Sequence, residues 1–158
     1  MQLIKLKTKI NSTLEICFDL SRSIDLHEIS TAHTNEKAVD GVTTGLINLN
    51  EFVTWQAKHF GITQKLTSQI TAYNRPFHFR DEQIKGAFKY IVHDHYFETK
   101  NGCIIMNDVF SFQSPFGFLG GVADKIVLKK YLTKLLVKRN AVIKEFAETN
   151  KWKELLIK

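Results

Sequence analysis

The feature that most limits the fold of this chain is a succession of strand-like segments in its middle part. These segments are rich in Thr, Val, Ile and aromatic residues, and residues typical of turns separate them. The strongest turn signal is Asn101-Gly102, a pair that favours a two-residue hairpin. The pattern therefore predicts a long antiparallel meander, with strands at residues 34–39, 45–49, 52–60, 62–73, 77–82, 88–97 and 103–112.

Different patterns precede this meander. In residues 3–10, apolar residues alternate with Lys and Thr, which predicts a strand with one face in water. Asn11, Ser12 and Thr13 are residue types that cap helices, and apolar residues at helical spacing follow them. We therefore expect a helix from residue 14 to about residue 23 and a second short helix over residues 24–30.

A long amphipathic helix is predicted at the C-terminal end. It begins after Gly117, with a bent first turn at Gly120-Gly121, and continues to about Thr149. Its apolar residues recur every three or four positions, and lysines occupy the opposite side. The apolar stripe consists of Leu128, Tyr131, Leu132, Leu135, Val142, Ile143 and Phe146, and the lysines are Lys130, Lys134, Lys138 and Lys144.

The order of these elements predicts an α+β fold within one domain, residues 1–158. A curved antiparallel sheet buries one face, and the long helix is the element available to cover it. A content of 44% hydrophobic residues is sufficient for a core of this kind. No apolar run approaches the roughly 20 residues of a transmembrane helix, and the N-terminus does not resemble a signal peptide. We expect a cytoplasmic protein in which Cys17 and Cys103 are buried thiols.

The positive charge is concentrated in residues 118–158, which carry ten basic and four acidic side chains. The remainder of the chain has equal numbers of basic and acidic side chains. A basic element is either an attachment surface for nucleic acid or an anionic membrane, or an ordinary solvated helix face. No pattern of aromatic residues or glycines for stacking bases accompanies the lysines, so we expect no nucleic acid. A weak contact with an anionic surface through the C-terminal helix remains open.

Four short strings resemble the SRPBCC superfamily, the START-like or helix-grip proteins that include the birch pollen allergen fold and the polyketide cyclases. The resemblance spans the whole chain and is greatest to bacterial ligand-binding members. Ile91 stands where the family often has Trp, and Cys103 and Ile104 stand near a frequent Thr. The strings are Lys58-His59-Phe60-Gly61-Ile62, Pro76 with Phe79-Arg80-Asp81, Ile91-Val92-His93-Asp94-His95-Tyr96-Phe97, and Asp108 followed by Pro115-Phe116-Gly117.

This resemblance implies a helix-grip fold, with about seven antiparallel strands wrapped around the C-terminal helix and two short helices after the first strand. It also implies a cavity between sheet and helix that holds an apolar small molecule. Side chains alternate between the two faces of a strand, and the resemblance indicates which face of residues 88–97 points inward. The inward sets are Trp55, Ala57 and His59; Phe77, Phe79 and Asp81; Ile91, His93, His95 and Phe97; and Ile104, Met106, Asp108, Phe110 and Phe112.

Arg139 is an exception within the apolar stripe of the last helix, where it falls between Leu135 and Val142. A guanidinium on an apolar face needs an anion. It can pair with Asp81 or Asp108, clamp a carboxylate or phosphate of the ligand, or extend along the edge of the stripe into solvent. The sequence leaves these three interpretations open.

The histidines allow two further interpretations. His93 and His95 share a strand face, and with His59 and Asp108 they form a set that zinc accepts. Histidines in a half-polar cavity more often hydrogen-bond Asp, Tyr or a ligand, so we expect no metal and no cofactor. His93 or His95 with Asp108 is also a candidate general base for a cyclase or dehydratase. No nucleophile motif such as Gly-x-Ser-x-Gly is present, so we expect binding without catalysis.

The function that we expect is the binding or carriage of a lipid, polyketide, quinone or aromatic metabolite. The alternatives are the cyclase or dehydratase, and an interaction module that docks through its basic C-terminal helix. Apolar walls with a few placed polar groups are typical of ligand pockets. The expected ligand-binding residues are Trp55, His59, Phe79, Asp81, Ile91, His93, His95, Phe97, Met106, Asp108, Phe110 and Arg139.

Overall fold

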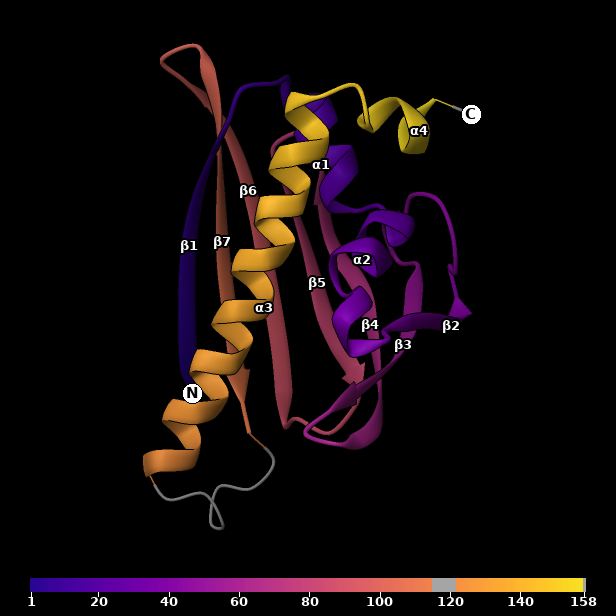
Figure 1. Ribbon diagram of the computed structural model, residues 1–158, viewed down its shortest axis with the longest axis vertical. Helices are drawn as coiled ribbons and strands as arrows, with labels where there is room; N and C mark the ends of the chain where they lie inside the picture. Colours follow the sequence, from indigo (N-terminus) through magenta and orange to yellow (C-terminus); the bar gives the residue numbers. More distant parts are fainter. Residues whose placement is uncertain (115–121, 158) are drawn as a thin grey trace.

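Seven antiparallel strands form one curved sheet, and a long helix lies across its inner face (Figure 1). The structure is a computed structural model and describes residues 1–114 and 122–157. The strands are β1 (Gln2–Ile10), β2 (Lys37–Gly41), β3 (Phe52–His59), β4 (Ile62–Asn74), β5 (His78–Lys85), β6 (Tyr90–Lys100) and β7 (Cys103–Gln113). The helices are α1 (Leu14–Ser21), α2 (Ile24–Ser30), the 3-10 turn Ala32–Thr34, α3 (Val122–Glu148) and α4 (Trp152–Leu156).

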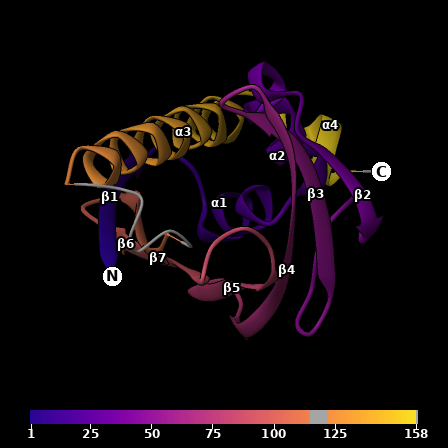
Figure 2. The same ribbon diagram turned by 90° about the horizontal axis from the view of Figure 1, so that it is seen from below.

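The order of strands in the sheet is β1-β7-β6-β5-β4-β3-β2. The consecutive strands β2 to β7 form a meander, and β1 joins it beside the last strand, with Ile4 opposite Phe110 and Ile10 opposite Ile104. Figure 2 shows the sheet curving around α1, with α3 across the open side. The predicted α+β arrangement is therefore confirmed, and its concave face is available to form a site.

Capping residues and turns place these elements where the sequence predicted them. The Thr13 side chain accepts a hydrogen bond from the Ile16 amide at 3.3 Å, and the Ser23 side chain accepts one from the Leu26 amide at 3.2 Å. Asn101 and Gly102 both have positive φ, of 51° and 75°, as a tight hairpin between twisted strands requires. The predicted cap at Thr13 and the predicted hairpin are both present, and Ser23 provides a second cap that was not predicted.

Two predictions about secondary structure were wrong. Residues 45–49 do not form a strand; they form a loop with one isolated bridge between Leu46 and Ser23. The loop packs against the start of α2, where the Gly45 carbonyl accepts from the Ile24 amide at 2.9 Å. Phe77 precedes β5 and is half exposed, so it does not point into the interior. The short helix α4 was not predicted.

Some predictions concern parts of the chain that lie outside the described residues. These are the string Pro115-Phe116-Gly117 and the bent turn at Gly120-Gly121. The helix that follows, α3, ends at Glu148, next to the predicted end at Thr149. Among the described helices, none is long and apolar enough to cross a membrane.

Gly41 provides a test of the backbone at the edge of the sheet. Its φ is +74°, and a Cβ there would lie 2.2 Å from the carbonyl oxygen of Phe52. Gly102 has a similar φ of +75°, but a Cβ there meets no atom of the described chain within 4 Å. Both Ala variants adopt the left-handed conformation at a cost of about 1–2 kcal/mol, and only Gly41→Ala adds a collision with the backbone.

We expect Gly41→Ala to lower the free energy of unfolding by about 1 kcal/mol more than Gly102→Ala does, because the neighbouring strand has to shift. Urea denaturation of the two variants measures this difference. Equal losses would show that β2 adjusts its position at no cost.

Candidate ligand-binding cavity

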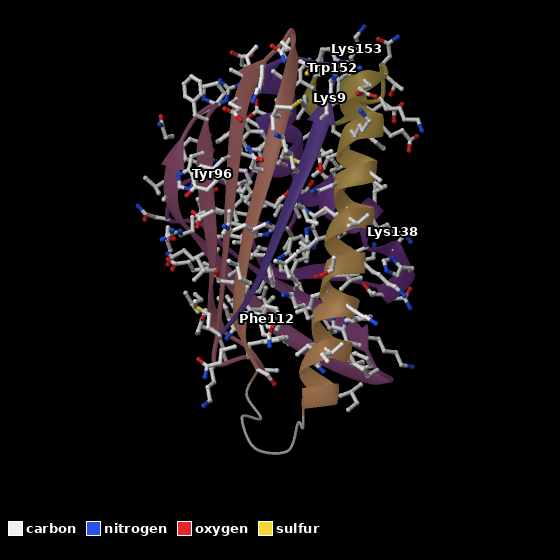
Figure 3. All side chains as sticks on the ribbon, turned by 90° about the vertical axis from the view of Figure 1, so that its left-hand side faces the viewer. Lys9, Tyr96, Phe112, Lys138, Trp152 and Lys153 are labelled. Atoms are coloured by element: carbon white, nitrogen blue, oxygen red, sulfur yellow. The ribbon has the colours of Figure 1, made fainter. Side chains whose placement is uncertain are left out.

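A cavity of about 400 Å³ lies between the concave face of the sheet and α3. Its walls are mainly apolar side chains from β3, β4, β6 and α3, with a smaller contribution from α2 and the loop that follows it. Figure 3 shows how the side chains of sheet and helix face each other across this space, while Lys138 lies on the side of α3 turned away from the sheet. The apolar part of the wall includes Ile47, Val53, Leu66, Ile70, Phe88, Leu128, Leu132, Leu135 and Leu136.

The structure separates the predicted site residues into two groups. Eight of them line the cavity: Trp55, His59, Phe79, Asp81, Ile91, His93, Phe110 and Arg139. The other four, His95, Phe97, Met106 and Asp108, are buried but are not part of the cavity wall. All twelve come from the strand faces or the helix stripe that the sequence pattern indicated.

Phe97 and Met106 do not reach the cavity because α1 fills that half of the interior. The Phe18 ring of α1 packs edge-on against Phe97, with ring centroids 5.5 Å apart. Met106 is fully buried, and its sulfur accepts a hydrogen bond from the Ser21 hydroxyl at 3.5 Å. One half of the space beneath the helices is therefore a packed core, and the cavity occupies the other half.

A cluster of ionisable side chains forms the polar part of the cavity wall and the layer behind it. His93 Nε2 donates to Asp108 Oδ1 at 2.8 Å, and His95 Nε2 donates to Asp81 Oδ2 at 3.0 Å. The Nδ1 atom of His95 lies 3.1 Å from Asp108 Oδ1, outside hydrogen-bond alignment. The two rings are in contact, with centroids 3.7 Å apart. Asp81 and His93 face the cavity, and His95 and Asp108 support them from behind.

Asp108 is the centre of this cluster. Its second oxygen accepts a hydrogen bond of 2.6 Å from the Asn140 side chain on α3. Arg139 Nη1 lies 3.8 Å away from its first oxygen. Burial by itself raises the pKa of this carboxyl, but the contacts with His93 and His95 outweigh that effect and hold the pKa well below 3.8. Asp108 is therefore a buried carboxylate that remains ionised.

Burial lowers the pKa of His93, whereas it raises that of Asp108, because the charged form of a histidine is the protonated one. Removal from water lowers the pKa of this imidazole to about 4, with a further contribution from the neighbouring His95, although Asp108 and Asp81 act against it. His93 is accordingly neutral at pH 7. Asp81 remains ionised, because burial raises its pKa less than the hydrogen bond from His95 and the charges around it lower that pKa.

Arg139 does not extend into solvent, so that interpretation of the sequence was wrong. The residue is 8% exposed, and its Nη2 donates to the Ser21 carbonyl at 2.7 Å. Its Nη1 has no hydrogen-bond partner among the described residues. The guanidinium joins α3 to the end of α1 and keeps one donor group at the cavity wall.

A second polar group lies on the side of the cavity formed by β3, the 3-10 turn and α3. His59 Nδ1 and the Tyr131 hydroxyl are 2.7 Å apart, and His27 Nε2 lies 3.4 Å from Glu36. Burial raises the pKa of Glu36, but the charge and contact of His27 lower it more, so Glu36 stays ionised. The His27 ring also stacks on the Trp55 ring, with the two ring centroids 4.1 Å apart. His59 therefore belongs to this group and not to the one around His93.

The sequence analysis missed most of the cavity residues that α2 and the segment after it contribute. His27 lies in the short helix α2, and Thr31 and Glu36 lie between elements, so no apolar period singled these residues out. Leu66, Ser68 and Ile70 were detectable, because they alternate along one face of a segment already assigned as a strand. Leu136 was omitted from the helix stripe although it is one of the buried residues of α3.

Comparisons with known proteins identify the fold. No protein-family model matches the sequence, and no curated protein matches it. The similar solved structures include the three described below, which share 11–15% identity with this chain, a level that establishes the fold alone.

TTHA0849 from Thermus thermophilus has a TM-score of 0.70 and 12% identity, over 90% of this chain and 97% of that chain. The ginseng major latex-like protein 151 from Panax ginseng has a TM-score of 0.67 and 15% identity, over 94% of this chain and 98% of that chain. The di-domain ARO/CYC StfQ from the steffimycin biosynthetic pathway has a TM-score of 0.72 and 11% identity, over 92% of this chain and 50% of that one. These similarities confirm the helix-grip fold that the four sequence strings predicted.

Proposed function

We propose that this helix-grip chain binds and carries an apolar small molecule in the cavity between its sheet and α3. The observation that carries the proposal is the cavity itself, with a volume of about 400 Å³ and walls that are mainly apolar. Ligand pockets generally have volumes of about 300–1,000 Å³ and a few placed polar groups. A lipid segment, a polyketide, a quinone or an aromatic metabolite fits these properties.

The positions of the polar groups narrow the class of ligand. Asp81, His93 and Arg139 form one polar region of the wall, and His59 with Tyr131 forms another. An apolar body between them contacts leucines, isoleucines and aromatic rings. The ligand that best fits this wall is therefore amphipathic, with hydrogen-bonding substituents on a hydrophobic frame.

A cyclase or dehydratase remains the alternative. Its support is that His93, neutral and bonded to Asp108, faces the cavity, as a general base has to. The name of the neighbour StfQ, an ARO/CYC, points in the same direction. We favour binding because no nucleophile motif such as Gly-x-Ser-x-Gly accompanies this histidine in the sequence and the rest of the cavity wall is mainly apolar.

The proposal places the protein in the cytoplasm, where the buried Cys17 and Cys103 remain thiols. The lysines of α3 form an exposed basic face that includes Lys129, Lys130, Lys134 and Lys138. We keep a weak contact of this face with an anionic surface as a secondary part of the proposal.

Leu135→Trp tests the binding proposal directly. Leu135 lines the cavity, and the larger indole occupies space that the ligand needs. We expect this variant to bind a fluorescent apolar probe at least about 10-fold more weakly than the wild type, because a clash of this size costs more than about 1.4 kcal/mol. Fluorescence titration with 1-anilinonaphthalene-8-sulfonate measures the affinity.

The matched control is Val137→Trp, which adds the same ring to an exposed position on the same helix. It should bind the probe as the wild type does. Equal affinities in all three proteins would place the probe outside the cavity and would count against the proposal.

A further inference from the structure

We propose that Asp81, His93 and His95 bind a divalent first-row transition metal ion, with an open coordination position toward the cavity. These three side chains project from the inner faces of the neighbouring strands β5 and β6, where Asp81 is the cross-strand partner of His93. The proposal replaces the expectation from the sequence that this chain has no metal site.

The ligand atoms already lie close to the positions that a metal requires. The candidate ligand atoms of the three residues lie within 4.8 Å of one another. Asp81 Oδ2 is 3.0 Å from His95 Nε2 and 3.9 Å from His93 Nδ1. Ligands bound at about 2.1 Å in a tetrahedral site are separated from one another by about 3.4 Å. Small side-chain movements are therefore sufficient to complete the site.

Asp108 lies behind the two rings, where it accepts a hydrogen bond from His93 and is close to His95 without hydrogen-bond alignment. Each ring directs one nitrogen to Asp81 and the other to Asp108: His93 Nε2 is 2.8 Å and His95 Nδ1 is 3.1 Å from Asp108 Oδ1. Metal-binding histidines commonly have a carboxylate on the nitrogen that does not bind the metal, because it fixes the tautomer and increases the basicity of the ligand. Asp108 is in turn held by Asn140 at 2.6 Å.

The site also has access to the cavity, which a purely structural site does not need. Asp81 and His93 line the cavity, and the Asp81 side chain is 28% exposed. Arg139 Nη1, which is 3.8 Å from Asp108 Oδ1 and has no hydrogen-bond partner among the described residues, belongs to the same wall. Three protein ligands with one open position are typical of metal sites that bind a further molecule. Here that molecule is an oxygen-bearing anion, which the metal and the guanidinium bind together.

The ligand set determines the class of metal. Two imidazoles and one carboxylate suit Zn²⁺, Fe²⁺, Co²⁺ and Ni²⁺, whereas Mg²⁺ and Ca²⁺ prefer sites made of oxygen alone. Without the metal, Asp81 and Asp108 carry two negative charges against the single positive charge of Arg139. A divalent ion offsets the excess of negative charge in this buried cluster.

Titration of the untagged chain with Zn²⁺ in a calorimeter tests the proposal. We expect one ion to bind per chain, and we expect Asp81→Asn to weaken binding at least about 100-fold, because even outer-shell changes cost 10–100-fold. Asn keeps the size of the side chain but removes the charged ligand oxygen. The control is His78→Gln, which removes a histidine on the outer face of the sheet that contacts Asp94, and its affinity should equal that of the wild type.

A second measurement does not depend on any variant. Co²⁺ bound at this site should give a visible absorption band typical of four- or five-coordinate cobalt. The bound Co²⁺ should also broaden the imidazole NMR signals of His93 and His95 more than those of His59. Failure of Zn²⁺ to bind, equal binding by Asp81→Asn, or broadening at His59 in place of His93 would each overturn the proposal.

The metal proposal and the binding proposal fail separately. An apolar probe that binds equally well in the presence of a chelator, together with an absence of Zn²⁺ binding, would reject the metal site and leave the binding function intact. Zn²⁺ binding with loss in Asp81→Asn, but no binding of an apolar probe, would reject the binding function and leave the metal site intact.

Discussion

Replacing Asp108 with Asn is expected to lower the free energy of unfolding by about 3 kcal/mol, because it removes the anion at the centre of a buried cluster. Asp108 is 1% exposed, and its oxygens contact His93, Asn140 and Arg139. An amide in this position leaves the Arg139 guanidinium without the nearby carboxylate. The amide NH2 group also faces His93 or Asn140, both of which donate hydrogen bonds to Asp108. Urea denaturation at pH 7 measures the loss.

Asp94→Asn is the matched control, since Asp94 lies on the outer face of the same sheet and also contacts a histidine and an arginine. His78 Nε2 is 2.7 Å away and Arg80 Nε is 2.8 Å away, but the Arg80 side chain is 39% exposed. We expect a loss of about 1 kcal/mol, as for ion pairs near water. Equal losses for both variants would show that the inner cluster contributes no more to stability than the contacts of Asp94, which is itself buried but pairs with a partly exposed Arg80.

Replacing Arg139 with Met is the second change with a large expected effect, again about 3 kcal/mol. Met keeps the length and the helix propensity of the side chain but removes the positive charge near Asp108 and the donor to the Ser21 carbonyl. Urea denaturation measures this loss as well, and titration with an anionic apolar probe then shows whether the guanidinium also contacts the ligand.

Lys138→Met is the control, because Lys138 is the exposed neighbour of Arg139 on the same helix. Its effect should remain within about 0.5 kcal/mol, as for ordinary surface substitutions. If both variants lose the same small amount, Arg139 is not part of the buried cluster and no longer belongs among the site residues.

The fold could be predicted from the sequence because local patterns and the global arrangement agree. Alternation identified the inward face of β7 correctly, the resemblance to helix-grip proteins selected the inward face of β6, and Asn101-Gly102 fixed one hairpin. The wrong strand at residues 45–49 shows the limit of such patterns. Its apolar residues serve a loop that packs against α2, a tertiary contact that alternation cannot distinguish from a strand.

The candidate site was predictable only in part, for a related reason. Alternation indicates that Phe97 and Met106 point inward, but it does not indicate what lies on the other side of the interior. Phe18 of α1 fills that half of the molecule. His27 reaches the cavity from the short helix α2 and Glu36 from the segment before β2, where no period marks one face. The clustering of Asp81 with His93 and His95 depends on the register between β5 and β6, which the sequence does not specify.

Native mass spectrometry of the chain produced in its own host tests most directly whether the cavity between sheet and α3 holds an apolar molecule. We expect a bound small molecule on the wild type and on Val137→Trp, released on denaturation, and a chain without it for Leu135→Trp. A bare chain in all three cases, or the same bound molecule on Leu135→Trp, would show that the cavity does not bind such a molecule.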